Sequence, residues 1–400
     1  MTMKLPCGYR FSGIYSGVKR NQKALDLSLI VSDLPATAAG VYTTNLVYGA
    51  PVHVDRSQTP GEGFRLVVVN SGVANACTGE RGIRDAETMI QAALKSIGAE
   101  QEKGLVMSTG VIGEFLPLTK IQSGIENAAQ QLADDETAFV RAAQGMMTTD
   151  TRHKIASREV MLDSGTTVRL AGMCKGAAMI GPNMATMLAV IFTDAKLEPD
   201  VAQNLLSASV DESFNCISVE GHMSTSDTVL FLANGAASPA PIKSGTNDFN
   251  RFASAFEEIC LQLARAIPAD GEGASHLITI HVQGCADRNT ARQIAKTVAE
   301  SSLVKTAITG ADPNWGRIVS AAGYSGVVFD PRKVGLKLNG YELYRDGSPI
   351  SFNAQTVSAS IRDNHDTDIE LTLGEGDASI RYWTTDLTAE YVRLNADYHT

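Results

Sequence analysis

The stretch KGAAMIGPNMATML, residues 175–188, places one hydroxyl, that of Thr186, between a Gly-Pro-Asn turn and an apolar segment. A threonine hydroxyl is a weak nucleophile because it holds its proton far above neutral pH. If the Ala185–Thr186 peptide bond breaks, Thr186 gains an α-amine, with a pKa of about 7.7–8.0, that can take this proton. The hydroxyl can break the bond itself by attacking the Ala185 carbonyl, and a strained turn before a rigid strand suits that attack. The residues thus raise the possibility of a self-generated N-terminal nucleophile.

The same stretch also has an ordinary structural interpretation. Threonine is β-branched and common in strands, and Gly-Pro-Asn is a frequent turn. On the pattern alone, a strand residue without chemistry is the favoured interpretation of Thr186.

The composition indicates a globular chain with enough apolar residues for a packed core. Of its 400 residues, 44% are hydrophobic and 20% are charged. This length suggests two or three domains of ~150 residues each. The formal net charge of −10 and the lack of a basic run argue against nucleic acid or an anionic membrane as a partner. A small anionic substrate remains compatible, because a local pocket can be positive on an acidic protein.

The cysteines and the N-terminus bear on the cellular compartment. The six cysteines stand at positions 7, 77, 174, 216, 260 and 285, with no CxxC pair. Such scattered thiols are typical of a reduced, cytosolic protein. The first 20 residues lack the apolar core of a signal peptide, and no apolar run reaches the ~18–20 residues of a membrane span. We therefore expect a soluble cytoplasmic protein.

Short β-branched runs alternate with amphipathic stretches along the chain. Strands are predicted at 65–72, at 104–110, at 167–173, directly after Thr186, at 228–235 and at 276–284. Helices are predicted at 85–97, 118–132, 200–214 and 248–267. This alternation is that of an α/β protein, although it specifies no simple doubly wound strand order.

The pattern changes after residue 284. One helix-like stretch, 290–309, leads through the turn GADPNWG to strand candidates at 333–340 and 368–383. We therefore expect a separate α+β domain from about residue 280. The stretch AASPAPIKSGT, residues 236–246, has the composition of a linker, but it is short enough to be a surface loop within one domain.

Several well-known catalytic motifs are absent from the sequence. It contains no P-loop, no HExxH and no GxSxG, and Gly271-Glu272-Gly273 lacks the third glycine of a dinucleotide fingerprint. The seven histidines are far apart in sequence. We therefore expect no metal and no resident cofactor.

The stretch around Thr186 resembles the signature KGxGMIxPNMATML of the ornithine acetyltransferases, or glutamate N-acetyltransferases, of arginine biosynthesis. The resemblance covers nearly the whole chain, in the family's order. Its further landmarks are VVNSGVANACTG (68–79), MSTGVIGEFLP (107–117), MMTTD (146–150), SLVKTAITGADPNWGRI (302–318) and NADYHT (395–400). Several long motifs in register make the resemblance specific, and it favours the nucleophile interpretation of Thr186 over the strand residue.

The resemblance implies a fold and an assembly. The expected fold is an αββα-type layered catalytic domain at residues 1–279, similar to that of aminopeptidases, with a smaller α+β domain at 280–400. The precursor would cut itself between Ala185 and Thr186. Chains 1–185 and 186–400 would stay associated, and two such pairs would form an α2β2 assembly.

The resemblance also implies a reaction. Thr186 would take an acetyl group from N2-acetylornithine and release ornithine. It would then pass the acetyl group to L-glutamate, in a ping-pong transfer through an acetyl-Thr186 ester. Some members also accept acetyl-CoA as the donor, which makes them bifunctional, and no single residue here decides this point.

The resemblance assigns roles to individual residues. Each half-reaction passes through a tetrahedral oxyanion, which needs preorganised donors, and this role falls to Thr109 and Gly110. Substrate contacts fall to Thr149, Lys175, Thr186, Glu272, Asn395 and Thr400. Lys175 suits a carboxylate and Glu272 suits an ammonium group. Without the resemblance, these residues would be read as turn residues, solvated charges or a frayed tail.

Three residues depart from the family's pattern. Ala178 stands where glycine is usual, which reduces backbone freedom near the expected cleavage point. Glu220 replaces aspartate and Ser226 replaces asparagine in EGHMSTSD, residues 220–227. We expect these changes to affect cleavage efficiency and substrate choice but not the class of reaction.

Two other functions remain open at this stage. The first is an amidase or aminopeptidase that uses the same N-terminal threonine and transfers the acyl group to water. Ornithine release that does not depend on glutamate would favour it. The second is a non-catalytic α/β protein that binds amino-acid-like ligands, which requires an intact chain.

Overall fold

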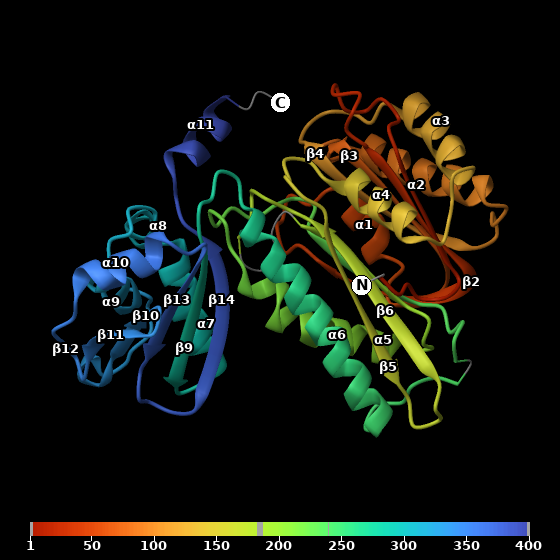
Figure 1. Ribbon diagram of the computed structural model, residues 1–400. Helices are drawn as coiled ribbons and strands as arrows, with labels where there is room; N and C mark the ends of the chain where they lie inside the picture. The colour runs from red at the N-terminus through yellow and green to blue at the C-terminus, as the bar shows by residue number, and fades with distance from the viewer. Residues whose placement is uncertain (1–2, 182–186, 239, 398–400) are drawn as a thin grey trace. The chain divides into compact units, whose positions relative to one another are not determined.

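The backbone of the computed structural model divides into two compact units, and the model describes residues 3–181, 187–238 and 240–397 (Figure 1). Unit 1 comprises residues 1–176, 183–215 and 223–264. Unit 2 comprises residues 177–182, 216–222 and 265–400. The expected domain boundary near residue 280 lies inside a strand of unit 2, Leu277–Cys285, and the longest piece of unit 2 begins earlier, at Arg265.

Unit 1 is built on one mixed sheet with the strand order β4-β3-β2-β8-β7-β6-β5, and β1 pairs with β2 in addition. The strands are β1 (Tyr9–Ile14), β2 (Leu27–Tyr42), β3 (Gly61–Val73), β4 (Lys103–Val111), β5 (Lys154–Met161), β6 (Thr167–Lys175), β7 (Leu188–Thr193) and β8 (Thr228–Ala233). The pairs β3–β4 and β7–β8 are parallel, and the other pairs are antiparallel.

The long strand β2 joins the two halves of this sheet. Its first part, Leu27–Val31, pairs with β1 and β3, and its last part, Thr37–Tyr42, pairs with β8. Between them, residues 33–35 are exposed and the register with β3 shifts. The bend lets one continuous sheet supply both layers of a sandwich.

Alternation along the strands separates an inner core from an outer one. In β3, Val67 and Val69 belong to the inner core together with Phe192 of β7, whereas Leu66 and Val68 belong to the outer one. A strand that is buried on both faces has apolar residues at successive positions, which explains the sequence LVVV at residues 66–69 of β3. This core joins β2–β4 to β6–β8.

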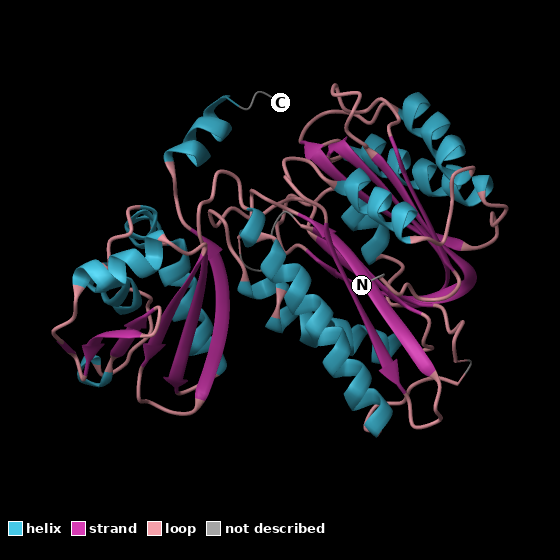
Figure 2. Ribbon diagram, in the orientation of Figure 1, coloured by secondary structure: helices cyan, strands magenta, loops and turns pink. Residues whose placement is uncertain are grey.

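Helices complete the layers of unit 1 (Figure 2). They are α1 (Ala50–Arg56), α2 (Gly79–Ser96), α3 (Leu118–Ala129), α4 (Glu136–Met146), α5 (Pro199–Glu212), a 3-10 turn (Phe214–Cys216) and α6 (Asn247–Ala266). The outer core lies between α2, α3 and the β2–β4 half, and α6 packs on the other half, where Phe256 meets Phe231 of β8 at 4.6 Å between ring centroids. Helix α5 joins β2 through Gln203, whose side chain bonds both backbone groups of Gly40. The result is the expected αββα arrangement.

Unit 2 is a smaller α+β unit with the strand order β12-β11-β10-β13-β9-β14. Its strands are β9 (Leu277–Cys285), β10 (Gly335–Leu338), β11 (Tyr341–Arg345), β12 (Ser348–Pro349), β13 (Asp366–Thr372) and β14 (Ala378–Thr385). Its helices are α7 (Arg288–Glu300), α8 (Ser302–Thr309), α9 (Trp315–Gly323), α10 (Ala354–Arg362) and α11 (Ala389–Asp397), with 3-10 turns at Pro268–Asp270 and Pro331–Lys333. Strand β9 is parallel to β13 and antiparallel to β14.

Most of the predicted elements are confirmed within a few residues, and two predictions are wrong in detail. The helix expected at 290–309 is two helices, because Ser301 takes an extended conformation and its hydroxyl caps α8 at the Val304 N–H. The strand expected at 368–383 is two strands, separated by a turn in which Gly374 has a φ of 68°. The stretch 236–246 precedes α6 within unit 1 and is therefore not a linker between the units. Within the described ranges, no helix combines the length and apolar character needed to cross a membrane.

Candidate active site

The ends of β3 and β4 bring Thr109 and Gly110 into a rigid setting. The parallel register sets Gly110 opposite Gly72, and Ser108 donates a hydrogen bond to Asn70 at 2.6 Å. Gly110 has a φ of 133°, and a Cβ there would lie 2.2 Å from the carbonyl carbon of Gly72. Only glycine fits this close approach. The backbone at Thr109–Gly110 is therefore held in place before any ligand arrives.

Lys175, the last residue of β6, reaches the same place. Its side chain is buried, and its Nζ donates a hydrogen bond to the Thr109 hydroxyl at 3.3 Å. Lys175 also pairs with Leu188, the first residue of β7, in the antiparallel register of these strands. An ammonium group thus stands beside a hydroxyl, in the strand that pairs with the segment after Thr186.

Asp150 is the buried counter-ion of this region. Its carboxylate accepts hydrogen bonds from Lys154 Nζ at 2.6 Å, from the Gly176 N–H at 2.7 Å and from the Thr148 N–H at 3.0 Å. Burial by itself would raise the pKa of Asp150, but Lys175, Lys154 and the Gly176 N–H hold it at about 2. Asp150 is therefore ionised at neutral pH and joins the loop after α4 to the end of β6.

A third lysine, the half-buried Lys19, belongs to the same cluster. Lys19 Nζ donates hydrogen bonds to the carbonyls of Leu25 and Met147, both at 2.6 Å. Burial, opposed by Asp26 and Asp150 and assisted by nearby Lys175, lowers the pKa of Lys19 to about 8. The cluster thus holds three lysines, Lys19, Lys154 and Lys175, and three carboxyl groups, those of Asp26, Asp150 and Asp227. The buried Lys175 ammonium suits an anionic group such as a substrate carboxylate.

The residue that follows Thr186 is held from the side of β8. Asp227 Oδ1 accepts a hydrogen bond from the Met187 N–H at 3.1 Å, and the Thr228 N–H donates to the Met187 carbonyl at 3.1 Å. Asp227 is fully buried, and this burial raises the pKa of its carboxyl well above the usual range. Two hydrogen bonds thus fix the backbone one residue beyond the expected nucleophile.

The structure brings some of the predicted site residues together and leaves others outside the described residues. Thr109 and Lys175 meet directly, and the half-buried Thr149 adjoins Asp150. In unit 2, Asn395 donates a hydrogen bond to Glu272 at 3.0 Å. Ala185, Thr186 and Thr400 lie outside the described residues, so the predictions on them stand as they were made.

Three residues of the cluster were not anticipated from the sequence: Lys19, Asp26 and Lys154. Nothing in the spacing of these residues distinguishes them from solvated surface charges, which most lysines and aspartates are. Asp150 carried a weak signal, because it ends the motif MMTTD beside Thr149. Of the departures from the family's pattern, Ser226 is buried, with its N–H bonded to the Ser224 hydroxyl at 3.0 Å.

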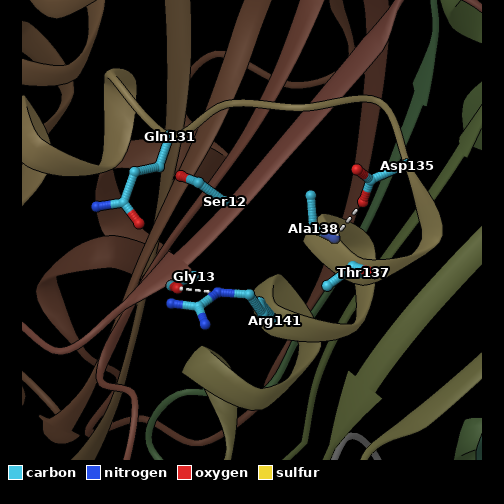
Figure 3. Close-up of a pocket in the computed structure, with 7 residues that line it drawn as sticks. All are labelled: Ser12, Gly13, Gln131, Asp135, Thr137, Ala138 and Arg141. Carbon is cyan, nitrogen blue, oxygen red and sulfur yellow. Dashed lines mark hydrogen bonds between the residues drawn. The ribbon is translucent and has the colours of Figure 1, made fainter.

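A small pocket of about 130 Å³ lies elsewhere in unit 1, between β1 and α4 (Figure 3). It is lined by Ser12, Gly13, Gln131, Asp135, Thr137, Ala138 and Arg141. Its charged groups are engaged in the fold, since Asp135 caps α4 at the Ala138 N–H and Arg141 donates to the Gly13 carbonyl. None of the predicted site residues lines it. Among residues 3–181, 187–238 and 240–397, no three histidine, cysteine or acidic side chains gather as a metal site would require.

Replacement of Asp150 tests the charge balance of the cluster. Asp150→Asn leaves Lys154 and Lys175 buried without their counter-ion, and we expect it to lower the free energy of unfolding by about 3–5 kcal/mol at pH 7. Because the pKa of Asp150 is lowered in the folded state, to about 2, its contribution is complete above the unfolded pKa of about 3.9 and is lost as the pH falls towards 2. Urea unfolding of both proteins at several pH values measures the difference.

The matched control is Asp33→Asn, since Asp33 forms a salt bridge with Arg10 on the surface. We expect a much smaller change from it, because surface ion pairs contribute little. An Asp150→Asn protein as stable as the wild type at pH 7 would contradict the role of this carboxylate.

The chain is similar to known proteins over nearly its whole length. It is 46% identical over 397 residues to the arginine biosynthesis bifunctional protein ArgJ of Rhodopirellula baltica, and the aligned region covers 99% of this chain and 96% of that protein. It is 43% identical to the protein of the same name from Thermotoga neapolitana, with 100% of both chains covered. A mitochondrial ArgJ protein of Yarrowia lipolytica is 41% identical, with 99% of this chain and 94% of that protein covered.

A solved structure and a family match agree with these relatives. The crystal structure of ArgJ from Bacillus halodurans superposes with a TM-score of 0.51 at 37% identity, covering 53% of this chain and 100% of that chain. The sequence matches the ArgJ family over residues 10–400, which is nearly its whole length. The protein therefore belongs to the ArgJ family.

Proposed function

We propose that this protein is a glutamate N-acetyltransferase of arginine biosynthesis that moves an acetyl group from N2-acetylornithine to L-glutamate. The names of its relatives support the pathway, since they are arginine biosynthesis bifunctional proteins. The observation that carries the proposal is the buried Lys175 ammonium, 3.3 Å from the Thr109 hydroxyl. It sets a cation and a hydrogen-bond donor together beside strand β7, which begins two residues after Thr186.

The nucleophile is made by self-cleavage. The Thr186 hydroxyl oxygen attacks the Ala185 carbonyl carbon, and the C–N bond breaks, so the Thr186 nitrogen becomes a free amine and an ester joins the two residues. Water then hydrolyses this ester, which leaves a carboxylate at Ala185 and restores the Thr186 hydroxyl. The new amine can act as the general base for that hydroxyl.

The acetyl transfer follows in two steps. The Thr186 hydroxyl attacks the acetyl carbonyl of N2-acetylornithine while the amine takes its proton and delivers it to the departing ornithine nitrogen. The α-amine of glutamate then attacks the acetyl ester, and N-acetylglutamate leaves as the Thr186 hydroxyl regains a proton. Each step passes through an oxyanion, and stabilisation of that charge is usually the largest catalytic effect.

The described residues have matching roles in this proposal. Thr109 and Gly110 are the oxyanion donors, because the close approach of Gly110 to Gly72 preorganises their backbone. Lys175 and Thr149 receive the substrate's carboxylate. Glu272, held by Asn395, receives an ammonium group, and Thr400 completes the substrate contacts.

Three further properties belong to the same proposal. Acetyl-CoA serves as a second donor, in keeping with the word bifunctional in the relatives' names. The cleaved chains assemble as α2β2. The protein works in the cytoplasm without a resident cofactor.

Self-cleavage is tested by denaturing mass spectrometry of the purified full-length protein. We expect two fragments, 1–185 and 186–400, the second starting with TMLAVIFTDA. Thr186→Ala lacks the attacking hydroxyl and should remain one chain of full mass. A single intact chain in both samples would refute the nucleophile.

The acceptor is tested by measuring ornithine release from N2-acetylornithine with and without L-glutamate. In a ping-pong transfer, release without glutamate should stop after about one turnover, because the acetyl-Thr186 ester has no acceptor. Sustained release without glutamate would instead establish an amidase that transfers the acyl group to water.

The oxyanion role of Thr109 is tested by Thr109→Val, which keeps the shape but removes the hydroxyl. We expect kcat to fall by about 10²–10³-fold, as when one oxyanion donor is lost. Thr109→Ser restores the hydroxyl and should keep most of the activity. Equal kcat values for the valine and serine variants would show that the hydroxyl takes no part.

A further inference from the structure

Residues 177–181, which directly precede the segment with the expected cleavage bond, are seated on unit 2 although β6 before them belongs to unit 1. Part of this segment is hydrogen-bonded to Ser218–Gly221, and we call Met179–Gly181 together with Ser218–Gly221 the clasp. The carbonyl oxygen of Ile180 accepts three hydrogen bonds: from the Val219 N–H at 2.8 Å, the Gly221 N–H at 3.0 Å and the Ser218 hydroxyl at 3.3 Å. Ile180 is fully buried.

The Glu220 side chain bonds the other backbone group of Ile180, its N–H. Its Oε1 accepts a hydrogen bond from the Ile180 N–H at 2.7 Å, so both backbone groups of Ile180 are bonded within four consecutive residues. Burial raises the pKa of Glu220 to about 7, although N–H donors such as that of Ile180 lower it. The carboxyl keeps its acceptor oxygen in either protonation state.

The clasp imposes an unusual backbone on the residues before the cleavage segment. Met179 has a φ of 57°, a conformation that side-chain-bearing residues seldom adopt. A Cβ on Gly181 would lie 2.5 Å from the carbonyl carbon of Gly221, so the two segments of the clasp touch through their backbones. Non-glycine residues with positive φ persist only where the surroundings enforce them.

The second half of the clasp is itself firmly anchored. The buried Lys305 donates hydrogen bonds from Nζ to the Val219 carbonyl at 2.6 Å and to the hydroxyls of Thr384 and Thr385 on β14. The Ser218 N–H donates to the Trp383 carbonyl of the same strand at 2.9 Å. The seat for Ile180 is therefore part of the unit 2 sheet framework and not a loose loop.

We infer that the clasp positions the carbonyl side of the Ala185–Thr186 bond for self-cleavage, with Glu220 as its positioning residue; this rests on the proposed function. Only three residues lie between Gly181 and Ala185, and Met187 is held by its own hydrogen bonds to Asp227 and Thr228. Releasing a residue from a fixed conformation increases its backbone entropy. Opening the clasp would multiply the conformations of the segment and lower the fraction in which the hydroxyl can reach the carbonyl.

The clasp is tested by the rate of precursor cleavage in the full-length chain. Glu220→Ala removes the acceptor for the Ile180 N–H, and we expect cleavage to slow at least about tenfold. Glu220→Gln keeps an acceptor oxygen and should cleave within about threefold of the wild-type rate. Newly synthesised precursor is followed over time by denaturing electrophoresis and mass spectrometry.

Two further variants complete the series. Ser218→Ala removes one of the three donors to the Ile180 carbonyl and should slow cleavage less than Glu220→Ala does. Glu258→Ala is the control, because Glu258 is an exposed acid in unit 1 that forms a surface salt bridge with Arg158. We expect it to leave the cleavage rate within about twofold.

A second readout separates positioning from general damage. Once cleaved, Glu220→Ala should show the wild-type kcat per cleaved chain, because the clasp does not touch the substrate. A generally damaged protein would have a lower kcat as well as slower cleavage.

If wild-type precursor cleaves and Glu220→Ala cleaves equally fast, the clasp is refuted. If wild-type precursor never cleaves, the proposed function itself fails. The experiment therefore distinguishes failure of the clasp from failure of the proposed function. Should Glu220→Ala not fold, equal rates for Ser218→Ala and the wild type would refute the clasp.

Discussion

The buried carboxylate of Asp150 is the interaction on which the candidate active site depends. It balances Lys154 and Lys175 in a region with almost no solvent to screen them, and it bonds the Gly176 N–H at the end of β6. Unpaired charges in such surroundings would be costly. Because Asp150 is present, Lys175 can remain buried and charged beside Thr109, where a water-exposed lysine would have little effect on a substrate.

A second constraint is the hydrogen bonding of the backbone before and after the expected nucleophile, which involves different partners on the two sides. Residues 177–181 are seated on unit 2 through the carbonyl and N–H of Ile180, while Met187 is bonded to Asp227 and Thr228 within unit 1. The half-buried Glu220 and the buried Asp227 each accept a hydrogen bond from a backbone N–H, one on each side of the expected nucleophile. A reaction in which a side chain attacks its own peptide bond needs this control of backbone geometry more than it needs additional catalytic side chains.

Much of the fold could be predicted from the sequence, because the strands that form the core are short, apolar and bounded by turn residues. The runs at 65–72 and 104–110 became β3 and β4, and the expected αββα layers are present. The bent strand β2 was not predicted, because its two halves pair with different neighbours across an exposed Leu-Pro step. The domain boundary was not predictable either, since unit 2 takes three separate pieces of the chain. Such pairings between distant segments leave no local signal.

The sequence by itself determined the family and the chemistry of the candidate residues, because long motifs such as KGAAMIGPNMATML preserve residue types in fixed order. It could indicate that Thr109, Gly110 and Lys175 matter, but it could not show how they act together. Only the tertiary structure decided that Lys175 contacts Thr109, that Asp150 and Lys19 join them, and that Glu220 holds Ile180. The physical reason is that burial turns ordinary charged residues into a functional cluster, and burial depends on which distant strands meet.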